Sequence, residues 1–186
     1  MLLNTPICDF GWQAPGFSLK DPRGKVFTLE ESLGDRGLLI AFICNHCPYV
    51  QAIGERLASD TRELMAEGVN VLAIMANDYD IVPEDSPEQM LAFARHFGFE
   101  FPYLIDEDQS VAKSYGAVCT PDFFGFNKDG ELQYRGRLDD ARMGQFTDRN
   151  RELVDAMMQI AETGHGPEQQ IASMGCSIKW RGEAFC

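Results

Sequence analysis

The sequence predicts an α/β protein with a mixed central sheet and helices on both faces. Two unbroken apolar runs, LLIAFI at 38–43 and VLAIMA at 71–76, have the length and composition of strands that are buried on both faces. Each run is followed by a segment whose apolar residues recur at helical spacing. A hairpin pattern precedes the first run, and a second one lies nearer the C-terminus. Strands and helices in this order predict a sheet covered by helices.

Length and charge limit the classes of protein to consider. A chain of 186 residues is long enough for one domain with a sizeable core. The formal charge of −13 and the pI of about 4.5 argue against nucleic acid or anionic membrane as a partner, because a polyanion is repelled. The stretch MLLNTPICDF lacks the basic and apolar regions of a signal peptide, and no apolar run is long enough to span a membrane. We therefore expect a cytoplasmic protein whose partners are small molecules or proteins.

The N-terminal half begins with a hairpin and continues into a strand and a long helix. Residues 17–21 and 25–29 alternate apolar and polar side chains around the turn PRG. The buried strand at 38–43 follows. From Pro48 the apolar residues recur at helical spacing as far as Gly68, and proline favours the start of a helix as glycine favours its end. The sequence therefore places a junction between strand and helix just before Pro48.

The C-terminal half continues the pattern with shorter elements. The stretch SPEQ at 86–89 has the arrangement of a capping box and opens a helix that runs through Phe97. We interpret the acidic stretch 78–88 as a solvated loop, which follows the carboxyl end of a parallel strand and so can border a site. The other expected elements are a strand at 101–105, a short helix at 109–115, a hairpin with arms at 123–127 and 131–136, and a final helix at 151–161.

The chain divides into a main domain at 1–165 and a C-terminal tail at 166–186. The tail follows the last amphipathic helix and is the only appendage that the sequence suggests. Ile178 and Trp180 are the apolar residues expected to hold it against the domain.

The stretch ICNHCPY at 43–49 carries the strongest chemical signal. Its thiols, Cys44 and Cys47, are separated by two residues and lie where a buried strand meets a helix N-terminus. Unpaired N–H groups and the helix dipole stabilise a thiolate there, so we expect Cys44 to attack a disulfide and Cys47 to resolve the mixed intermediate. This chemistry needs no bound cofactor, only an external dithiol that recycles the pair. The six cysteines of the chain are too few for a disulfide scaffold and lie at 8, 44, 47, 119, 176 and 186.

His46 lies between the two thiols in sequence and supports the same interpretation. A donor beside a thiolate lowers its pKa, which stabilises the reduced pair and makes the couple more oxidising. Two other interpretations of the motif stay open. The two thiols can simply be packed at the end of a strand, or they can bind a metal together with His46 and a fourth ligand from Cys119 or Cys176.

A second cluster, VCTPD at 118–122, precedes an apolar strand. A proline that opens a strand in this way is a candidate for a cis peptide bond, and we place Thr120 and Pro121 beside the thiols, with Asn45 as a further supporting residue. Cys119 is either a third redox thiol or a small residue packed in the loop. Cys176, in MGCSIKW, can reach back as a resolving thiol or pair with Cys119, but a tail held down by Ile178 and Trp180 is the favoured interpretation. Cys8 and Cys186 have no local context.

These motifs resemble those of a known family. APGFSL at 14–19 and GKVFTL at 24–29 resemble the N-terminal hairpin of thioredoxin-fold proteins of the AhpC/TSA (redoxin) type. CNHC resembles the active-site position of that family, and Thr120-Pro121 resembles its cis-proline loop. The stretches CNHCPYV, NDYDIVPEDSPE, CTPDFF and GCSIKW resemble a peroxiredoxin-like subgroup. The resemblance implies a thioredoxin-like fold with an N-terminal hairpin extension.

The resemblance also implies roles for individual residues and shows two departures. Cys44 resembles the nucleophile of thioredoxins, Cys47 the resolving cysteine, and Pro121 the cis-proline that faces them. Leu38 stands where thioredoxins have a buried carboxylate. The peroxidatic cysteine of peroxiredoxins aligns with Cys47. Cys44 stands where peroxiredoxins have an activating Thr or Ser, and Pro121 stands where they have an Arg from a later strand.

These departures rank the candidate functions. A peroxidase needs positive donors that orient peroxide, whereas disulfide exchange needs a paired thiol and a docking edge. We therefore expect a thiol-disulfide oxidoreductase that acts on protein or small-molecule disulfides. The alternative is an antioxidant thiol peroxidase that uses Cys47, with Arg135 or Arg137 reaching the site from another direction. A thiolate metal carrier is the second alternative.

Overall fold

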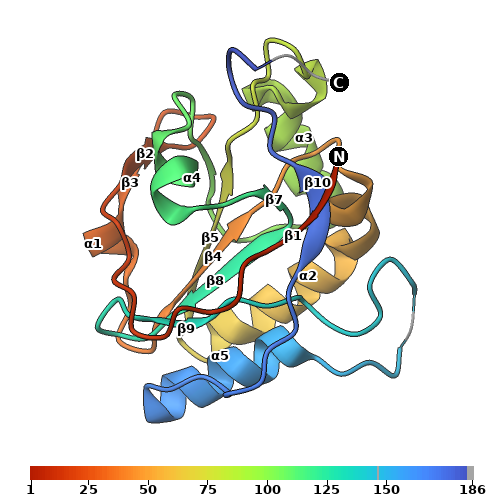
Figure 1. Cartoon of the computed structure of the whole chain (residues 1–186). Coiled ribbons are helices and arrows are strands. Elements are labelled where there is room, and N and C mark those ends of the chain that lie inside the picture. Colours follow the sequence, from red (N-terminus) through yellow and green to blue (C-terminus); the bar gives the residue numbers. More distant parts are fainter. Residues whose placement is uncertain (146, 184–186) are drawn as a thin grey trace.

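The computed structural model describes residues 1–145 and 147–183, and it shows a central mixed sheet covered by helices on both faces (Figure 1). The seven strands lie in the order β3-β2-β6-β5-β4-β8-β9. Strands β4, β5 and β6 are parallel to one another, whereas β8 and β9 at one side and β2 and β3 at the other are antiparallel to their neighbours. The strands span β2 Ser18–Lys20, β3 Val26–Thr28, β4 Leu38–Phe42, β5 Asn70–Met75, β6 Tyr103–Ile105, β8 Asp122–Phe126 and β9 Leu132–Tyr134.

The α/β fold and its N-terminal hairpin extension are as the sequence predicts. All five side chains of β4 are buried, with Leu39 and Ala41 in one core and Ile40 and Phe42 in the other. The first core lies against α2, α3 and α5, and the second lies against α4. The helices span α1 Leu29–Ser32, α2 Pro48–Ala66, α3 Pro87–Phe97, α4 Ser110–Tyr115 and α5 Glu152–Thr163, with a short 3-10 helix, η1, at Pro83–Asp85.

A second sheet was not expected from the sequence. It contains β1 (Leu2–Asn4), β10 (Met174–Ser177) and β7 (Cys119–Thr120), with β10 in the middle and antiparallel to both neighbours. Figure 1 shows the two end segments of the chain side by side as β1 and β10. A β-carbon at Gly175 would collide with the backbone carbonyl of Thr120, so the glycine is what lets β10 approach β7.

The segment after residue 165 is therefore tied to the domain by strand pairing. Ile178 is buried, and Trp180 packs at the edge of the second core, where Lys113 lies over its ring. The boundary at 165/166 itself stays a prediction. Among the residues that the structure describes, no helix has the length and apolar character needed to cross a membrane.

Three local predictions need correction. Helix α3 begins at Pro87 with Ser86 as its N-cap, but the Ser86 side chain makes no capping hydrogen bond. The strand predicted from residue 101 begins at Tyr103. The arm predicted to reach residue 136 ends at Tyr134, since the next N–H, that of Arg135, donates to Gln170 Oε1 instead of to a strand.

Candidate active site

The two motif thiols lie under the loop that contains the cis peptide bond. Chain segment 43–47 leaves β4 and enters α2, and the Thr120–Pro121 bond is cis. Cys44 Sγ lies 3.2 Å from Thr120 Oγ1, and Cys47 Sγ lies 3.2 Å from the Thr120 carbonyl oxygen. The fold thus brings together the two motifs that the sequence singled out. Both cysteine side chains have 0% of their surface exposed, so the pair is enclosed.

Cys47, rather than Cys44, occupies the N-terminus of α2. It is the N-cap residue and Pro48 is the first residue of the helix. The Cys44 thiol donates a hydrogen bond to the Cys47 sulfur, and the backbone N–H groups of Cys176 and Val50 also stabilise the anion, so that the pKa of Cys47 falls to about 4 although burial opposes the change. The helix begins at Pro48 as the sequence predicts, but the expectation that placed Cys44 at its N-terminus is wrong, because Cys47 occupies that position.

Cys44 has the opposite electrostatic environment. Burial raises its pKa well above the usual range, and the hydrogen bond to Cys47 and the negative charge of Asp85 raise it further. When the pair is reduced, the negative charge consequently resides on Cys47 and the proton on Cys44.

Asp85 accepts hydrogen bonds from the backbone of the motif. This residue, at the end of η1, is 0% exposed. Its Oδ1 accepts the backbone N–H of Asn45 at 2.7 Å and that of His46 at 3.1 Å, and its Oδ2 accepts Asn77 Nδ2 at 2.8 Å. Burial opposes ionisation, but hydrogen bonds from His46 and Asn77 outweigh it and lower the pKa of Asp85. A buried carboxylate with this many donors fixes the conformation of the loop between the thiols.

His46 connects this carboxylate to Cys44. Its Nδ1 lies 2.6 Å from Asp85 Oδ2 and 3.6 Å from Cys44 Sγ. The ring is partly exposed, with 24% of its side-chain surface accessible. The partly exposed ring thus lies beside Cys44, and its orientation is set by a carboxylate.

Asn45 has a positioning role. Its Nδ2 donates to the Glu84 carbonyl at 2.8 Å, and its Oδ1 accepts the Tyr103 hydroxyl at 3.1 Å. The Asn45 carbonyl accepts Gln51 Nε2 at 2.9 Å. These contacts join the motif to η1, β6 and α2, so that the loop is held on three sides.

Asp85 is the principal site residue that the sequence analysis missed. It lies within the acidic stretch 78–88, which was interpreted as solvated, and neither its spacing nor its neighbours distinguish it from the other acids there. The one available signal was its position after the carboxyl end of β5.

The other described cysteines differ in their access to the pair. Cys119 is 0% exposed, its Sγ lies 4.0 Å from the Pro121 carbonyl, and burial raises its pKa to about 12, all of which favour a packed residue. Cys176 is partly exposed and packs against the core that contains Cys44 and Cys47. Cys8 packs at the edge of the second core, and Cys186 lies outside the described residues.

A metal site would need a different set of ligands from the predicted one. In the part of the chain that the structure describes, the cluster with suitable spacing is Cys44, His46 and Asp85, whose ligand atoms lie within 4.8 Å of one another. Both oxygens of Asp85 already accept hydrogen bonds, and His46 Nδ1 faces both Asp85 and Cys44. A cation would have to displace the bond between His46 and Asp85, so the geometry fits a hydrogen-bonded triad better than a metal centre.

The arginines considered as peroxide donors are paired with carboxylates. Arg135 is buried against Asp122, with Nη2 2.9 Å from Oδ2, and lies over the Phe124 ring. Arg137 makes two hydrogen bonds to Glu152, at 2.6 and 2.7 Å. Their donor groups are therefore directed to these partners.

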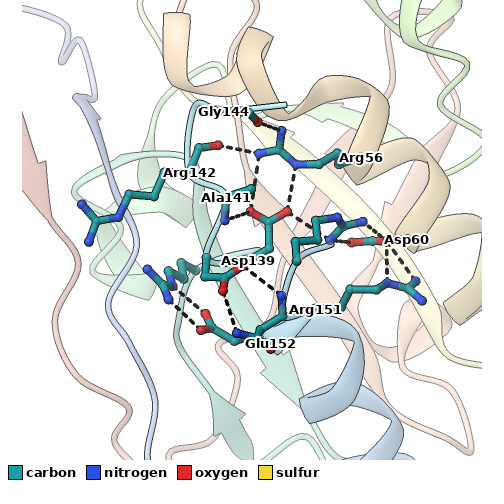
Figure 2. Close-up of polar contacts among 12 residues, drawn as sticks. Arg56, Asp60, Asp139, Ala141, Arg142, Gly144, Arg151 and Glu152 are labelled. Carbon is teal, nitrogen blue, oxygen red and sulfur yellow. Dashed lines mark hydrogen bonds and ion pairs between the residues drawn. The ribbon is translucent and has the colours of Figure 1, made fainter. Parts of the chain in front are cut away.

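A network of ion pairs fixes the loop that follows β9. Figure 2 shows Arg56 of α2 against Asp139 and the carbonyls of Arg142 and Gly144. Asp60, also on α2, binds Arg151 at 2.9 Å (Figure 2). The loop thereby forms one wall of a cavity of about 400 Å³ next to the cis-proline. Its mostly apolar lining includes Tyr49, Ile53, Pro121, Phe123, Ile171 and Met174.

Comparison with protein families agrees with this geometry. Residues 10–135 match the model of the AhpC/TSA family. The chain belongs to the AhpC/TSA family. The matched range contains the thiol pair, Asp85 and the cis-proline loop, whereas β10 lies beyond it.

Three similar proteins extend the comparison. An uncharacterized conserved protein from Geobacillus kaustophilus has a crystal structure with a TM-score of 0.92 and 41% identity, covering 99% of this chain and 98% of the other. Thiol-disulfide oxidoreductase ResA of Bacillus thuringiensis subsp. konkukian is 27% identical over 127 residues, which cover 67% of each chain. The thioredoxin domain of a thiol-disulfide oxidoreductase from Bacteroides vulgatus has a TM-score of 0.63 at 14% identity, covering 82% of this chain and 97% of the other, and it shows the shared fold.

Proposed function

We propose that the protein is a thiol-disulfide oxidoreductase that uses Cys44 and Cys47 as its redox pair. The observation that carries this proposal is the convergence of both sulfurs on Thr120, under a cis-proline, at the N-terminus of α2. The similarity to ResA, a protein named for this activity, supports it. The enzyme class follows from thiol chemistry alone and calls for no bound cofactor.

The two thiols have different roles. Cys47 carries the thiolate, which attacks one sulfur of a disulfide presented to it, and that disulfide bond breaks to release a first thiolate. Cys44 then loses its proton and attacks the Cys47 sulfur, and the mixed disulfide breaks to release a second thiolate. The substrate gains two electrons and two protons, and the Cys44–Cys47 disulfide forms. These assignments exchange the roles that the sequence suggested.

His46 and Asp85 provide the proton path in this scheme. Leu38 occupies the position of the buried carboxylate of thioredoxins, so the proton of Cys44 needs another acceptor. His46 Nδ1 lies 3.6 Å from the Cys44 sulfur and 2.6 Å from Asp85 Oδ2, and its ring is partly exposed. Because the Nδ1 proton is donated to Asp85, Nδ1 accepts the proton of Cys44 as its own proton passes to the carboxylate.

Peroxidase activity is less well supported. Cys44 and Pro121 occupy the positions of the peroxide-activating residues, and Arg135 and Arg137 are bound to Asp122 and Glu152. Paired in this way, neither arginine is directed to stabilise a departing hydroxide.

The partners follow from the same chemistry. Disulfides of proteins or small molecules are the substrates, and an external dithiol regenerates the pair. The apolar cavity beside Pro121 accommodates the chain that flanks a substrate disulfide. The cytoplasmic location expected from the sequence stays a prediction.

A redox titration tests the proposal. The reduced protein is equilibrated in a graded glutathione buffer, and the cysteines are mapped by mass spectrometry after rapid alkylation. We expect a reversible Cys44–Cys47 disulfide with one midpoint. A pair that stays reduced across the whole range, combined with rapid formation of sulfenic acid on Cys47 in stoichiometric peroxide, contradicts the proposal and favours the peroxidase.

A further inference from the structure

We infer that Cys176 is a third redox thiol, which passes disulfides between solvent and the buried pair. This inference rests on the proposed function and deepens it, because that proposal leaves open how a disulfide reaches Cys47. The sulfurs of Cys44 and Cys47 have no exposed surface, whereas Cys176 is partly exposed. Of the described cysteines close to the pair, it is the one that a substrate can reach.

The strand pairing places Cys176 beside Cys47. Cys176 lies opposite Thr120 in the register of β10 and β7, and Cys47 Sγ lies 3.2 Å from the Thr120 carbonyl oxygen. Cys176 packs against the core that contains Cys47, and each of the two residues shifts the pKa of the other's thiol. Cys47 thus has two cysteines as neighbours, Cys44 and Cys176.

The sequence of β10 is suited to this contact. The absence of a side chain at Gly175 allows β10 to pack directly on the Thr120 carbonyl, and the next residue is the cysteine. Lys179 and the N-terminal amino group of Met1 lie near enough to stabilise a negative charge on Cys176, although burial and the contact with Cys47 raise its pKa to about 11. Once Cys47 has formed a disulfide, the second of these two causes disappears, and Cys176 becomes a better leaving group.

The transfer proceeds in three balanced steps. The Cys176 thiolate attacks a substrate disulfide and releases the first substrate thiolate. The Cys47 thiolate then attacks the Cys176 sulfur, the mixed disulfide breaks, and the second substrate thiolate leaves. Finally Cys44 attacks the Cys47 sulfur and releases Cys176 as a thiolate. Cys44 and Cys47 lose two electrons to the substrate, whose two thiolates take up one proton released by Cys44 and one from solvent, and Cys176 is restored.

Cys8 provides a matched control. It is also half-buried, and burial also raises its pKa to about 11, but it packs at the edge of the other core. If exposure and thiol pKa alone decided the effect of Cys176, replacing Cys8 would slow oxidation of the Cys44–Cys47 pair to the same extent as replacing Cys176.

The test compares wild type with Cys44→Ser, Cys176→Ser and Cys8→Ser. Each reduced protein is mixed with glutathione disulfide, samples are quenched with acid at successive times, and the disulfide bonds are mapped by mass spectrometry. We expect Cys44→Ser to accumulate an intramolecular Cys47–Cys176 disulfide, and wild type to pass through the same bond before it forms Cys44–Cys47. Cys176→Ser should form Cys44–Cys47 at least ~10-fold more slowly because it loses an intramolecular step, whereas Cys8→Ser should match wild type.

The outcomes separate this inference from the proposed function. If Cys44→Ser stops at a glutathione adduct on Cys47, and Cys176→Ser oxidises as fast as wild type, Cys176 is not a redox thiol, while the Cys44–Cys47 couple stands. If wild type forms Cys47–Cys176 as its final disulfide, the inference stands and the proposed couple is wrong. The time course of wild type decides the question even if a variant does not fold.

Discussion

Cys44 and Cys47 are three residues apart and equally buried, yet their surroundings favour opposite states of ionisation. Cys47 caps a helix and faces backbone N–H groups, including that of Cys176 from β10. Cys44 faces the carboxylate of Asp85 from η1 and the buried hydroxyl of Tyr103 comes close to the same loop. The comparison teaches that the ionisation of each thiol depends on the other thiol and on segments distant in sequence, and not on the CxxC spacing alone.

Replacing each thiol in turn has the largest expected effect. Cys47→Ser removes the thiolate, so the rate of disulfide reduction should fall by at least ~10³-fold, to the level of the uncatalysed exchange. Cys44→Ser should also stop turnover but still form one disulfide at Cys47. The measurement is substrate reduction together with mass spectrometry of the protein. Equal loss of disulfide formation at Cys47 in both variants would remove the distinction between the thiols.

Asp85→Asn tests the Cys44 side. An amide has one acceptor oxygen where the carboxylate receives several donors, so we expect a loss of about 2–4 kcal/mol in the free energy of unfolding, measured in urea at neutral pH. The exposed Asp80→Asn is the control in the neighbouring loop.

The pH dependence of this loss follows from the lowered pKa of Asp85. Because the folded pKa lies below the unfolded value of about 3.9, the stabilisation is complete above roughly pH 5 and is lost as the pH falls through the folded pKa. The difference between wild type and Asp85→Asn should therefore shrink only in acid. A difference that grew in acid would contradict this role.

Gly175→Ala tests the Cys47 side. The added β-carbon collides with the Thr120 carbonyl, so β10 must move away and the N–H of Cys176 leaves the Cys47 sulfur. We expect a higher pKa for Cys47, seen as slower reaction of that thiol with an alkylating reagent at pH 5–6. Gly16→Ala is a suitable control, because its β-carbon meets no atom within 4 Å. No change in Gly175→Ala would show that β10 does not tune Cys47.

His46→Leu has the smallest expected effect. The histidine contacts Cys44, not the Cys47 thiolate, and Asp85 balances its charge. We expect the potential of the couple to become more negative by only ~10–30 mV, since 30 mV corresponds to about 1.4 kcal/mol. The glutathione titration gives this value directly. A shift to a less negative potential would contradict the role of His46 as a stabilising donor.

Much of the fold was predictable because its signals are local. The apolar runs identified β4 and β5, and helical spacing with proline and glycine at the ends identified α2. The sheet of β1, β7 and β10 was not predictable, because strands of two to four residues have too little pattern, and their pairing depends on contacts between the two ends of the chain.

The part of the site that depends on local motifs was also predictable from the sequence. Two thiols, a histidine and a cis-proline are recognisable motifs, and the structure brings them together. The helix start at Pro48 was predicted correctly, but Cys44 was credited with the helix N-terminus, although the residue directly before Pro48 is Cys47. Asp85 was missed since its burial depends on η1 folding under the motif, which no residue spacing reveals.

The most direct test of the central claim is a pH titration of the reduced protein with ¹³Cβ-labelled cysteines, followed by NMR and assigned with Cys44→Ser and Cys47→Ser. The account predicts that the Cys47 signal titrates with a midpoint near pH 4, the value to which its surroundings lower the pKa, while Cys44 stays protonated beyond its ordinary range. If Cys44 titrates first and Cys47 remains a thiol at neutral pH, Cys44 is the nucleophile and the assignment of the two roles is wrong.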